Sequence, residues 1–403
     1  MRFALSVMAV VSLAMPARAQ ELSASKIADL IPVPGILRNS ITNLQAQGDS
    51  LWVGPFLNLT VDGGATWQVS DADSLFGTRN STYSISVEEN VVWVGLGYTS
   101  QPSAGESVPA VAGYLVSTDG GRTFTFRGPH LDAADDDQVQ YGVSTLEALP
   151  IIVPEQSPPY DIDYDPSTGD VWIAAWASGI RRSSDEGRTW QRVVLPPDDL
   201  SSIHPDSSYD FVLAPQRGGT GNLNHMGFSV LVDETVTIWA GTPRGVNRST
   251  DGGVAWRRFS ADGTPNSLTG SWVISLEEQP VPGRNPIWMA SWNAGEVGER
   301  GRFGATVTRD GGETFEQMLI GERIYDFAFR GNQTVYAAGE NGLFISDDDG
   351  ITWRSVRHFV DASDPTRLVR PDANIFAVAT TEDALWAGTS EGLMKSTDGG
   401  QTW

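Results

Sequence analysis

The hydrophobic and polar residues of this chain follow a short pattern that recurs along most of its length. Each occurrence begins with an alternating stretch, such as SISVEE at 84–89 or YDIDYD at 160–165, with apolar residues at every second position. A compact apolar run follows, as in VWIA at 171–174, and then a third short run, as in GIRRS at 179–183. Alternation predicts strands with one buried face, whereas the compact runs predict strands buried on both faces.

The compact run occurs seven times, and its second residue is always Trp or Tyr. The copies are LWVG (51–54), VWVG (92–95), VWIA (171–174), IWAG (238–241), IWMA (287–290), VYAA (335–338) and LWAG (385–388). With one more strand after the turn described next, each unit holds four short antiparallel strands in about 40 to 60 residues, which is typical of a β-propeller blade.

A second motif closes each unit and reads Ser/Thr-x-Asp-x-Gly-x-Thr-aromatic. Its copies are TVDGGATW (60–67), STDGGRTF (117–124), SSDEGRTW (183–190), STDGGVAW (249–256), TRDGGETF (308–315), SDDDGITW (346–353) and STDGGQTW (396–403). Only the fourth copy departs from the pattern, with Ala255 in place of Thr. The Asp can accept hydrogen bonds from backbone N–H groups ahead of it, and the Gly permits a positive φ. The motif therefore predicts a tight turn between the third and fourth strands, followed by a buried aromatic residue.

These turns resemble the Asp-box (BNR) repeats of sialidases, xyloglucanases, sortilin-type receptors and photosystem II assembly propellers. The resemblance covers residues 41–403 and implies an all-β, seven-bladed propeller with one Asp-box per blade. In that superfamily the box lies away from the ligand-binding face, so the resemblance implies a structural role for its carboxylates. These are Asp62, Asp119, Asp185, Asp251, Asp310, Asp348 and Asp398. The alternative is a set of calcium or catalytic sites.

The two ends of the chain carry separate signals. Residues 1–19 have the three parts of a cleavable signal peptide: Arg2, an apolar run, and a small-x-small site at Ala17–Ala19. We therefore expect a secreted, periplasmic or cell-surface protein. Residues 20–40 are a possible closing strand for the ring. The last box ends at Trp403 without a fourth strand, so we expect an incomplete last blade and a truncated chain.

The composition limits the classes of partner that this chain is expected to bind. The chain has 403 residues, a net charge of −23 and no cysteine. Such acidity argues against nucleic acid and anionic membrane surfaces, and no segment after the signal peptide is long enough to insert into a membrane. No motif indicates a metal, a cofactor or a catalytic residue. The expected partner is a protein or a glycan, and the composition leaves the oligomeric state open.

The long insertions indicate where a ligand would bind. In a propeller blade the loops after the fourth and second strands share one face, and every long insertion of this chain is expected there: 98–112, 127–158, 195–225, 292–303 and 354–373. Loops on a rigid scaffold commonly carry binding, although neutral growth on a tolerant face is the alternative.

Five residues on this face are candidate ligand contacts. All but three of the 14 tryptophans occupy repeat positions. Two of the three, Trp176 and Trp292, each follow a strand Trp by four residues, and Tyr98 has a similar place in the second blade. Such aromatic side chains could stack on a sugar or anchor a peptide, or could pack between blades. Asn224 and His225 combine amide and imidazole groups in the insertion 195–225, without the spacing of a known metal site.

Three functions remain open. The first is a non-catalytic protein- or glycan-binding module that uses the insertion face. The second is a glycoside hydrolase similar to sialidases or xyloglucanases, although the Arg-Ile-Pro-like motif of sialidases is absent from IPVPGILRNS at 31–40. The third is a repeat segment of a larger cell-surface protein. The lack of a catalytic signature favours the binding module.

Overall fold

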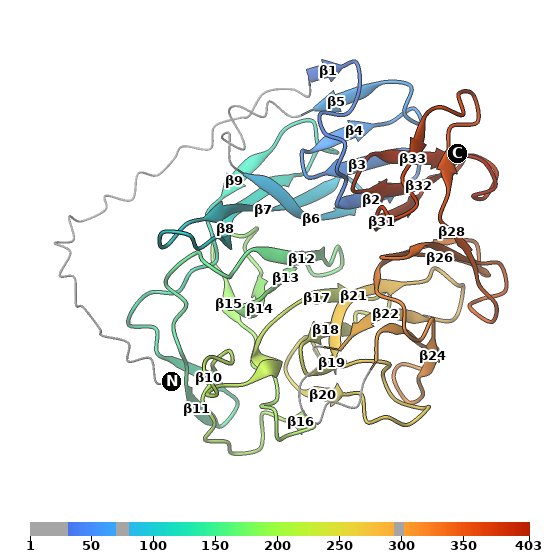
Figure 1. The fold of residues 1–403 in the computed structure, drawn as a ribbon. Helices are drawn as coiled ribbons and strands as arrows, with labels where there is room; N and C mark the ends of the chain where they lie inside the picture. Colours follow the sequence, from blue (N-terminus) through green and yellow to red (C-terminus); the bar gives the residue numbers. More distant parts are fainter. Residues whose placement is uncertain (1–30, 70–79, 294–301) are drawn as a thin grey trace.

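Seven small antiparallel sheets form a ring in the computed structural model, which describes residues 31–69, 80–293 and 302–403. Figure 1 shows the sheets as blades around a central axis, with the first and last blades side by side. The predicted all-β, seven-bladed propeller is confirmed. The predicted signal peptide lies outside the described residues. Within the described residues, no helix is long and apolar enough to cross a membrane.

Six blades have four consecutive strands in the order of the chain. Blade 1 contains β2 (Asn43–Gln47), β3 (Ser50–Gly54), β4 (Asn58–Thr60) and β5 (Trp67–Val69), and blade 2 contains β6 (Ser81–Glu88), β7 (Val91–Ser100), β8 (Val108–Ser117) and β9 (Thr125–Arg127). Blade 3 contains β12 (Pro159–Tyr164), β13 (Val171–Ala175), β14 (Gly179–Ser183) and β15 (Gln191–Arg192), and blade 4 contains β17 (Ser229–Val232), β18 (Ile238–Thr242), β19 (Gly245–Ser249) and β20 (Trp256–Phe259). Blade 5 contains β21 (Trp272–Glu278), β22 (Ile287–Trp292), β23 (Gly304–Thr308) and β24 (Glu316–Met318), and blade 6 contains β25 (Ile324–Arg330), β26 (Thr334–Gly339), β27 (Gly342–Ser346) and β28 (Arg354–Val356).

Blade 7 has three strands, β31 (Ile375–Thr380), β32 (Leu385–Thr389) and β33 (Leu393–Ser396), which fits the predicted incomplete blade. Segment 20–40 was expected as a possible strand that closes the ring, and its residues 31–33 form a strand in the structure. Strand β1 (Ile31–Val33) pairs with β5, so it adds a fifth strand to the outside of blade 1 and does not complete the last blade. Its register opposite β5 matches Ile31 with Val69 and Val33 with Trp67.

The insertions contain small elements of their own. The hairpin of β10 (Gln138–Tyr141) and β11 (Ser144–Glu147) lies between blades 2 and 3, and the hairpin of β29 (Phe359–Val360) and β30 (Leu368–Val369) precedes blade 7. Between blades 3 and 4, β16 (Ser202–Ile203) pairs with β20, and a short 3₁₀ helix, η2, spans Leu223–His225. Two expected loops are therefore shorter than predicted, because 354–356 forms β28 and the strands β7 and β8 extend into 98–112.

The strand pattern explains the core. Every residue of the second strand is buried in blades 3 and 4, where both faces of β13 and β18 meet another blade. The first strand alternates, as in β6, because one face lies against a blade and the other faces the axis. Burial of the second-strand aromatics is nearly complete; Trp52, Trp93, Trp172, Trp239, Trp288 and Trp386 are at most 3% exposed. These side chains fill the space between neighbouring blades.

In six of the seven Asp-boxes, a glycine makes room for the tryptophan of the blade before it. A Cβ built on Gly121 would lie 2.0 Å from the Trp52 ring, and one on Gly253 would lie 2.6 Å from the Trp172 ring. Six of the seven boxes have this contact. The seventh, at Gly400, follows the only blade with Tyr instead of Trp, and its glycine meets Ile345. The glycines are thus required both for a positive φ and for packing between blades.

The box side chains are hydrogen-bonded within the turn. In blade 3, the Ser183 hydroxyl donates to Asp185 Oδ1 (2.8 Å), and the Gly187 N–H donates to Ser183 Oγ (2.9 Å). The Thr189 N–H and hydroxyl donate to the two carboxylate oxygens of Asp185 at 2.9 and 2.7 Å. Burial would raise the pKa of Asp185, but these hydrogen bonds outweigh it and lower the pKa to about 2. The same pattern recurs in the other boxes, except that Ala255 supplies only its N–H.

Candidate functional site

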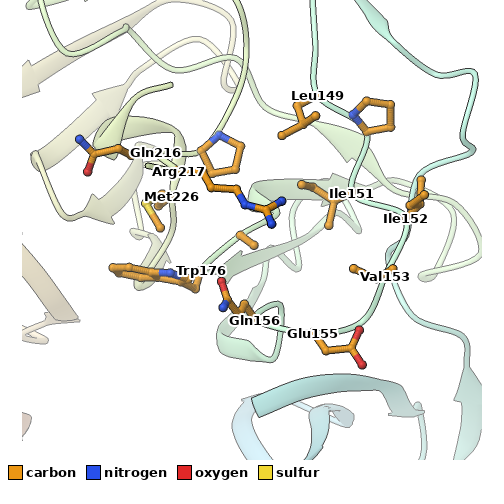
Figure 2. Close-up of a pocket in the computed structure, with 13 residues that line it drawn as sticks. Leu149, Ile151, Ile152, Val153, Glu155, Gln156, Trp176, Gln216, Arg217 and Met226 are labelled. Carbon is orange, nitrogen blue, oxygen red and sulfur yellow. The ribbon is translucent and has the colours of Figure 1, made fainter. Parts of the chain in front are cut away.

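Three segments that are far apart in the sequence meet on the insertion face beside blade 3. They are the insertion between β9 and β12, the turn between β13 and β14, and the insertion between β15 and β17. Together they form a pocket of about 330 Å³. Its lining is Leu149, Pro150, Ile151, Ile152, Val153, Glu155, Gln156, Trp176, Ala177, Pro215, Gln216, Arg217 and Met226, and Figure 2 shows these side chains around the opening. Most of the lining is aliphatic or aromatic.

One wall of the pocket is the apolar segment 149–153. Leu149, Ile152 and Val153 are 44%, 52% and 52% exposed, although hydrophobic residues of this size are usually buried. The Ile151 backbone is held on the protein side, because its N–H donates to Asp132 Oδ2 (2.7 Å) and its carbonyl accepts from the Asp132 N–H (2.9 Å). A cluster of exposed apolar side chains beside a cavity is typical of a binding surface.

Asp132 is itself fixed by two arginines from blade 3. Arg181 Nη1 and Nη2 contact the two carboxylate oxygens at 2.5 and 2.9 Å, and Arg192 Nη2 lies 2.9 Å from Oδ2. Burial would raise the pKa of Asp132, but the hydrogen bonds and charge of Arg181 outweigh it and lower the pKa to about 2. Since the Arg181 and Asp132 side chains are only 2% and 4% exposed, this ion pair locks the pocket wall onto the propeller.

Trp176 forms the opposite wall and is the one predicted contact that lies in the pocket. Its ring packs against Phe228 and Trp272, with centroids 5.0 and 5.6 Å away. The next residue, Ala177, donates its N–H to the carbonyl of Gln156 (2.9 Å), which joins the two sides of the pocket. The half-buried indole is therefore held in place before any ligand arrives.

Four polar side chains, those of Glu155, Gln156, Gln216 and Arg217, complete the lining. Glu155 accepts a hydrogen bond from the Ser100 hydroxyl (2.7 Å). Gln156 is exposed and has a left-handed backbone with φ of 60°, which is uncommon for a residue other than Gly, Asn or Asp. Arg217 extends over the pocket between Trp176 and Ile151 (Figure 2), and its guanidinium pairs with no carboxylate among the described residues.

A buried hydrogen-bond chain ends at Ser178, the residue that follows the pocket residue Ala177. The Tyr114 hydroxyl contacts His130 Nδ1, and His130 Nε2 lies 2.6 Å from the Ser178 hydroxyl. Burial and the charge of Arg181 lower the pKa of His130 to about 3, so the ring is neutral. Tyr114 is fully buried and its hydroxyl has no other partner in the described residues, so it donates to Nδ1 and Nε2 carries the proton. The ring then donates to Ser178, which is the reverse of what a nucleophilic serine needs.

The other predicted contacts lie elsewhere. Tyr98 is half-buried in β7 opposite Ala110, outside the pocket lining. Trp292 packs against Tyr325 at 5.4 Å and donates its indole N–H to the Ile324 carbonyl (2.8 Å). Like Trp176, it follows the second-strand Trp by four residues, yet it lies against blade 6 and not against an insertion. The rest of its predicted loop, 294–301, is outside the described residues.

Asn224 and His225 are buried in η2, where they hold the insertion together. The Asn224 amide contacts Asn247 Oδ1 at 2.9 Å and the Pro196 carbonyl at 2.7 Å. His225 Nε2 lies 3.1 Å from the Leu195 carbonyl, and burial lowers its pKa to about 4. With exposures of 0% and 5%, both side chains are directed at the protein and do not line the pocket.

The central channel collects carboxylates from the first strands of three blades. Asp161 and Asp326 each accept an N–H from the neighbouring blade, from Val230 and Val378 respectively, both at 2.9 Å. Burial raises the pKa of each to about 7. Glu277 also lines the channel but accepts no hydrogen bond from a described residue, and burial together with Asp326 raises its pKa well above the usual range. In the described residues no group of three or more His, Asp or Glu side chains has the arrangement of a metal site.

Sequence reasoning missed most of the pocket. Leu149–Val153, Gln156, Arg217 and Met226 belong to insertions without repeats, so no blade pattern marks them. One signal was available: LPIIVP at 149–154 is an apolar run between prolines inside a predicted loop. Such a run has no place in a solvated loop unless it is covered or binds a partner.

No family model and no curated protein matches this sequence. Solved structures are similar to it in fold. The GH74 xyloglucanase from Xanthomonas campestris is 13% identical, with a TM-score of 0.54 over 92% of this chain and 53% of its own. The extracellular domain of a one-component system from B. thetaiotaomicron is 14% identical, with a TM-score of 0.53 over 93% and 40%. YCF48 from Cyanidioschyzon merolae is 19% identical, with a TM-score of 0.52 over 91% and 98%.

These likenesses concern the fold alone, because identities below 20% do not carry function from one propeller to another. The chain also spans only about half or less of the first two proteins. The seven blades, each with an Asp-box turn, thus give this chain the same β-propeller fold as these structures.

Proposed function

We propose that this chain is an exported, non-catalytic binding module that captures a polypeptide on its insertion face. The observation that carries the proposal is the pocket between Trp176 and segment 149–153. A volume of about 330 Å³ suits a large apolar side chain, and the exposed aliphatic wall gives that side chain a surface to bury.

The lining favours a polypeptide over a glycan. Sugars are bound by several polar side chains around an aromatic face, whereas here Leu149, Ile152 and Val153 form a continuous apolar wall. Burial of apolar surface stabilises a complex by about 25 cal/mol per Å², so a wall of this kind supplies affinity to an apolar side chain but little to a hydroxylated ring. The fixed position of Trp176 lowers the entropy lost on binding.

Export is part of the proposal and rests on residues 1–19, with their charged start, apolar run and small-x-small site. The similarity in fold to an extracellular domain is compatible with it. Detection of the mature chain outside the cytoplasm, with its N-terminus at Gln20, is the direct test. An N-terminus at Met1 in the cytoplasm would refute export.

Glycoside hydrolysis is the alternative. It requires two carboxyl groups about 5 to 9 Å apart on either side of one glycosidic bond. In the part of the chain that the structure describes, Asp161 and Asp326 have both oxygens engaged with backbone N–H groups. We therefore expect no hydrolysis of aryl glycosides or xyloglucan. Turnover that is abolished by Glu277→Gln would overturn the non-catalytic proposal.

The binding experiment starts from displayed random heptapeptides selected on the purified chain. Selected peptides are then measured by fluorescence polarisation against the wild type, Trp176→Ala and the matched variant Trp292→Ala. Trp176→Ala is expected to weaken binding about tenfold or more, because a central aromatic contact is lost, and Trp292→Ala to leave it within about twofold.

Ile152→Ser provides a second variant on an exposed side chain, which the fold tolerates, and it is expected to weaken binding as well. Thermal unfolding confirms that each variant is folded. Peptides that bind with no sensitivity to Trp176 and Ile152 would refute the proposed site. Binding of glycans in place of peptides, with loss in Trp176→Ala, would refute the proposed ligand class.

A further inference from the structure

The polar groups of the pocket indicate which peptide fits it, and this inference rests on the proposed function. Arg217 is the only cation in the lining, it is exposed, and it forms no ion pair with a described residue. The other charged residue, Glu155, is hydrogen-bonded to Ser100. A lone guanidinium over an apolar surface is attracted to a carboxylate more strongly than it would be in open water.

Backbone hydrogen bonds hold the main chain of Arg217 in place, and so fix the point from which its side chain extends. The Arg217 N–H donates to the Thr220 carbonyl (2.8 Å), and the Thr220 N–H donates back (3.1 Å). Next to this turn, Asn222 pairs with Ala214 and accepts the Asp198 N–H through its side chain (2.9 Å). The hairpin therefore presents Arg217 toward Trp176 and Ile151, as Figure 2 shows.

Segment 149–153 offers backbone groups to an extended peptide. Both backbone groups of Ile151 are used by Asp132, whereas the N–H and carbonyl of Ile152 have no partner in the described residues. A peptide that lies along this segment can pair with Ile152 and continue past the pocket at both ends.

The geometry of an extended peptide then sets the position of the carboxylate. Neighbouring side chains of such a peptide point to opposite faces, so an acid next to the apolar anchor would point away from Arg217. An acid two residues from the anchor points to the same face, about 7 Å away. We propose that the pocket selects an extended internal peptide segment with an apolar anchor and an Asp or Glu two residues from it, bound by Arg217.

The probe is the fluorescein-labelled peptide Gly-Ser-Leu-Ala-Glu-Ser-Gly with an amidated C-terminus. Its controls replace Glu by Gln, move Glu to the position next to Leu, or replace Glu by Lys; a further peptide ends at Leu with a free carboxylate. We expect the probe to bind about tenfold more tightly than the Gln peptide and the shifted peptide, because only its carboxylate reaches Arg217.

A charge reversal tests the contact directly. In Arg217→Glu the preference is expected to invert, so that the Lys peptide binds more tightly than the Glu peptide. Arg284→Glu is the matched control, since Arg284 is an exposed arginine outside this pocket with the same change in net charge. It is expected to keep the wild-type preference.

The outcomes separate this inference from the proposed function. If the peptides bind through Trp176 but the Gln and Glu peptides are equal, or Arg217→Glu changes nothing, the carboxylate rule is wrong and the binding module stands. Tightest binding of the peptide with the free C-terminal carboxylate would also refute the internal segment. If no peptide depends on Trp176, both proposals fail.

Discussion

Gly64 of the first Asp-box lies directly against the ring of Trp386 on the last blade. A Cβ on Gly64 would be 2.9 Å from Trp386 Cη2, and the same ring makes an edge contact with Trp67 at 6.4 Å. Five other neighbouring pairs of blades repeat this relationship, but this one joins the ends of the ring. Side-chain packing, with the Ile41 N–H donating to the Thr389 carbonyl (2.9 Å), thus closes the propeller.

Gly64→Ala is predicted to destabilise the chain more than Gly63→Ala. Both glycines have positive φ, so both variants carry the backbone cost of roughly 1 kcal/mol. Only the methyl of the Gly64 variant meets a rigid ring, whereas the methyl of the Gly63 variant meets the flexible end of Lys395. The additional loss of unfolding free energy is about 1 to 3 kcal/mol. Denaturant unfolding measures both, and equal losses would contradict closure through this contact.

Ala255→Thr is predicted to stabilise blade 4. In the other boxes a Thr hydroxyl donates to the second carboxylate oxygen, for example Thr189 to Asp185 at 2.7 Å. Restoring this bond to Asp251 should add about 0.5 to 1 kcal/mol to the unfolding free energy. The reverse change, Thr189→Ala, should remove a similar amount. A lower melting temperature for Ala255→Thr would show that blade 4 cannot accept the hydroxyl.

Asp132→Asn is predicted to loosen the pocket wall and to destabilise the fold. Removing one partner of a buried ion pair leaves Arg181 uncompensated, which costs about 3 to 5 kcal/mol. The control is Asp136→Asn, because Asp136 also contacts Arg192 (3.3 Å) but is 53% exposed, and exposed pairs contribute about 0 to 1 kcal/mol. Similar losses in the two variants would mean that the clamp on Ile151 has no special role.

The same clamp predicts a dependence on acid. Because the pKa of Asp132 is lowered to about 2 in the folded chain, the unfolded chain takes up its proton first. The stabilisation by Asp132 is therefore complete above about pH 4 and is lost as the pH falls toward 2. Asp132→Asn should remove this part of the acid sensitivity, and an unchanged acid limb of the stability curve would contradict it.

Glu277→Gln tests a carboxyl group of the central channel whose pKa is raised in the folded chain, which is the opposite of the shift at Asp132. Burial and Asp326 raise the pKa of Glu277, so the folded chain holds this proton after the unfolded chain has lost it. Its contribution to stability therefore falls as the pH rises above about 4. The variant should match the wild type near pH 4 and exceed it increasingly toward pH 8. Glu382→Gln, on an exposed side chain, is the control. A difference in unfolding free energy between the variant and the wild type that stays constant from pH 4 to pH 8 would refute the prediction.

The repeated parts of the fold could be predicted from the sequence because the same contacts recur between neighbouring blades and require the same residue types. In six pairs of neighbouring blades, the Trp at the second position of the compact apolar run meets a Gly in the box of the following blade, so both residues recur and are visible in the sequence. The partner of β1 was not predictable in this way. Ile31–Val33 has no counterpart in other blades, and its register is set by Val69 and Trp67.

The pocket was largely hidden from sequence reasoning for the same reason. Trp176 could be found because it breaks the repeat, but its partners at 149–153 and Arg217 come from insertions that meet only after folding. Asn224 and His225 had suitable chemistry for a site, yet η2 turns both inward, where they bond to Asn247 and Leu195. Residue type identified polar groups without indicating which of them face solvent.

The central claim is that the pocket beside Trp176 is where this propeller binds a polypeptide. Its most direct test is a crystal structure of the chain with a selected heptapeptide. The account predicts an apolar side chain between Trp176 and Ile151, with the peptide backbone alongside Ile152. A peptide bound on the opposite face, among the Asp-box turns, or inside the central channel would contradict it.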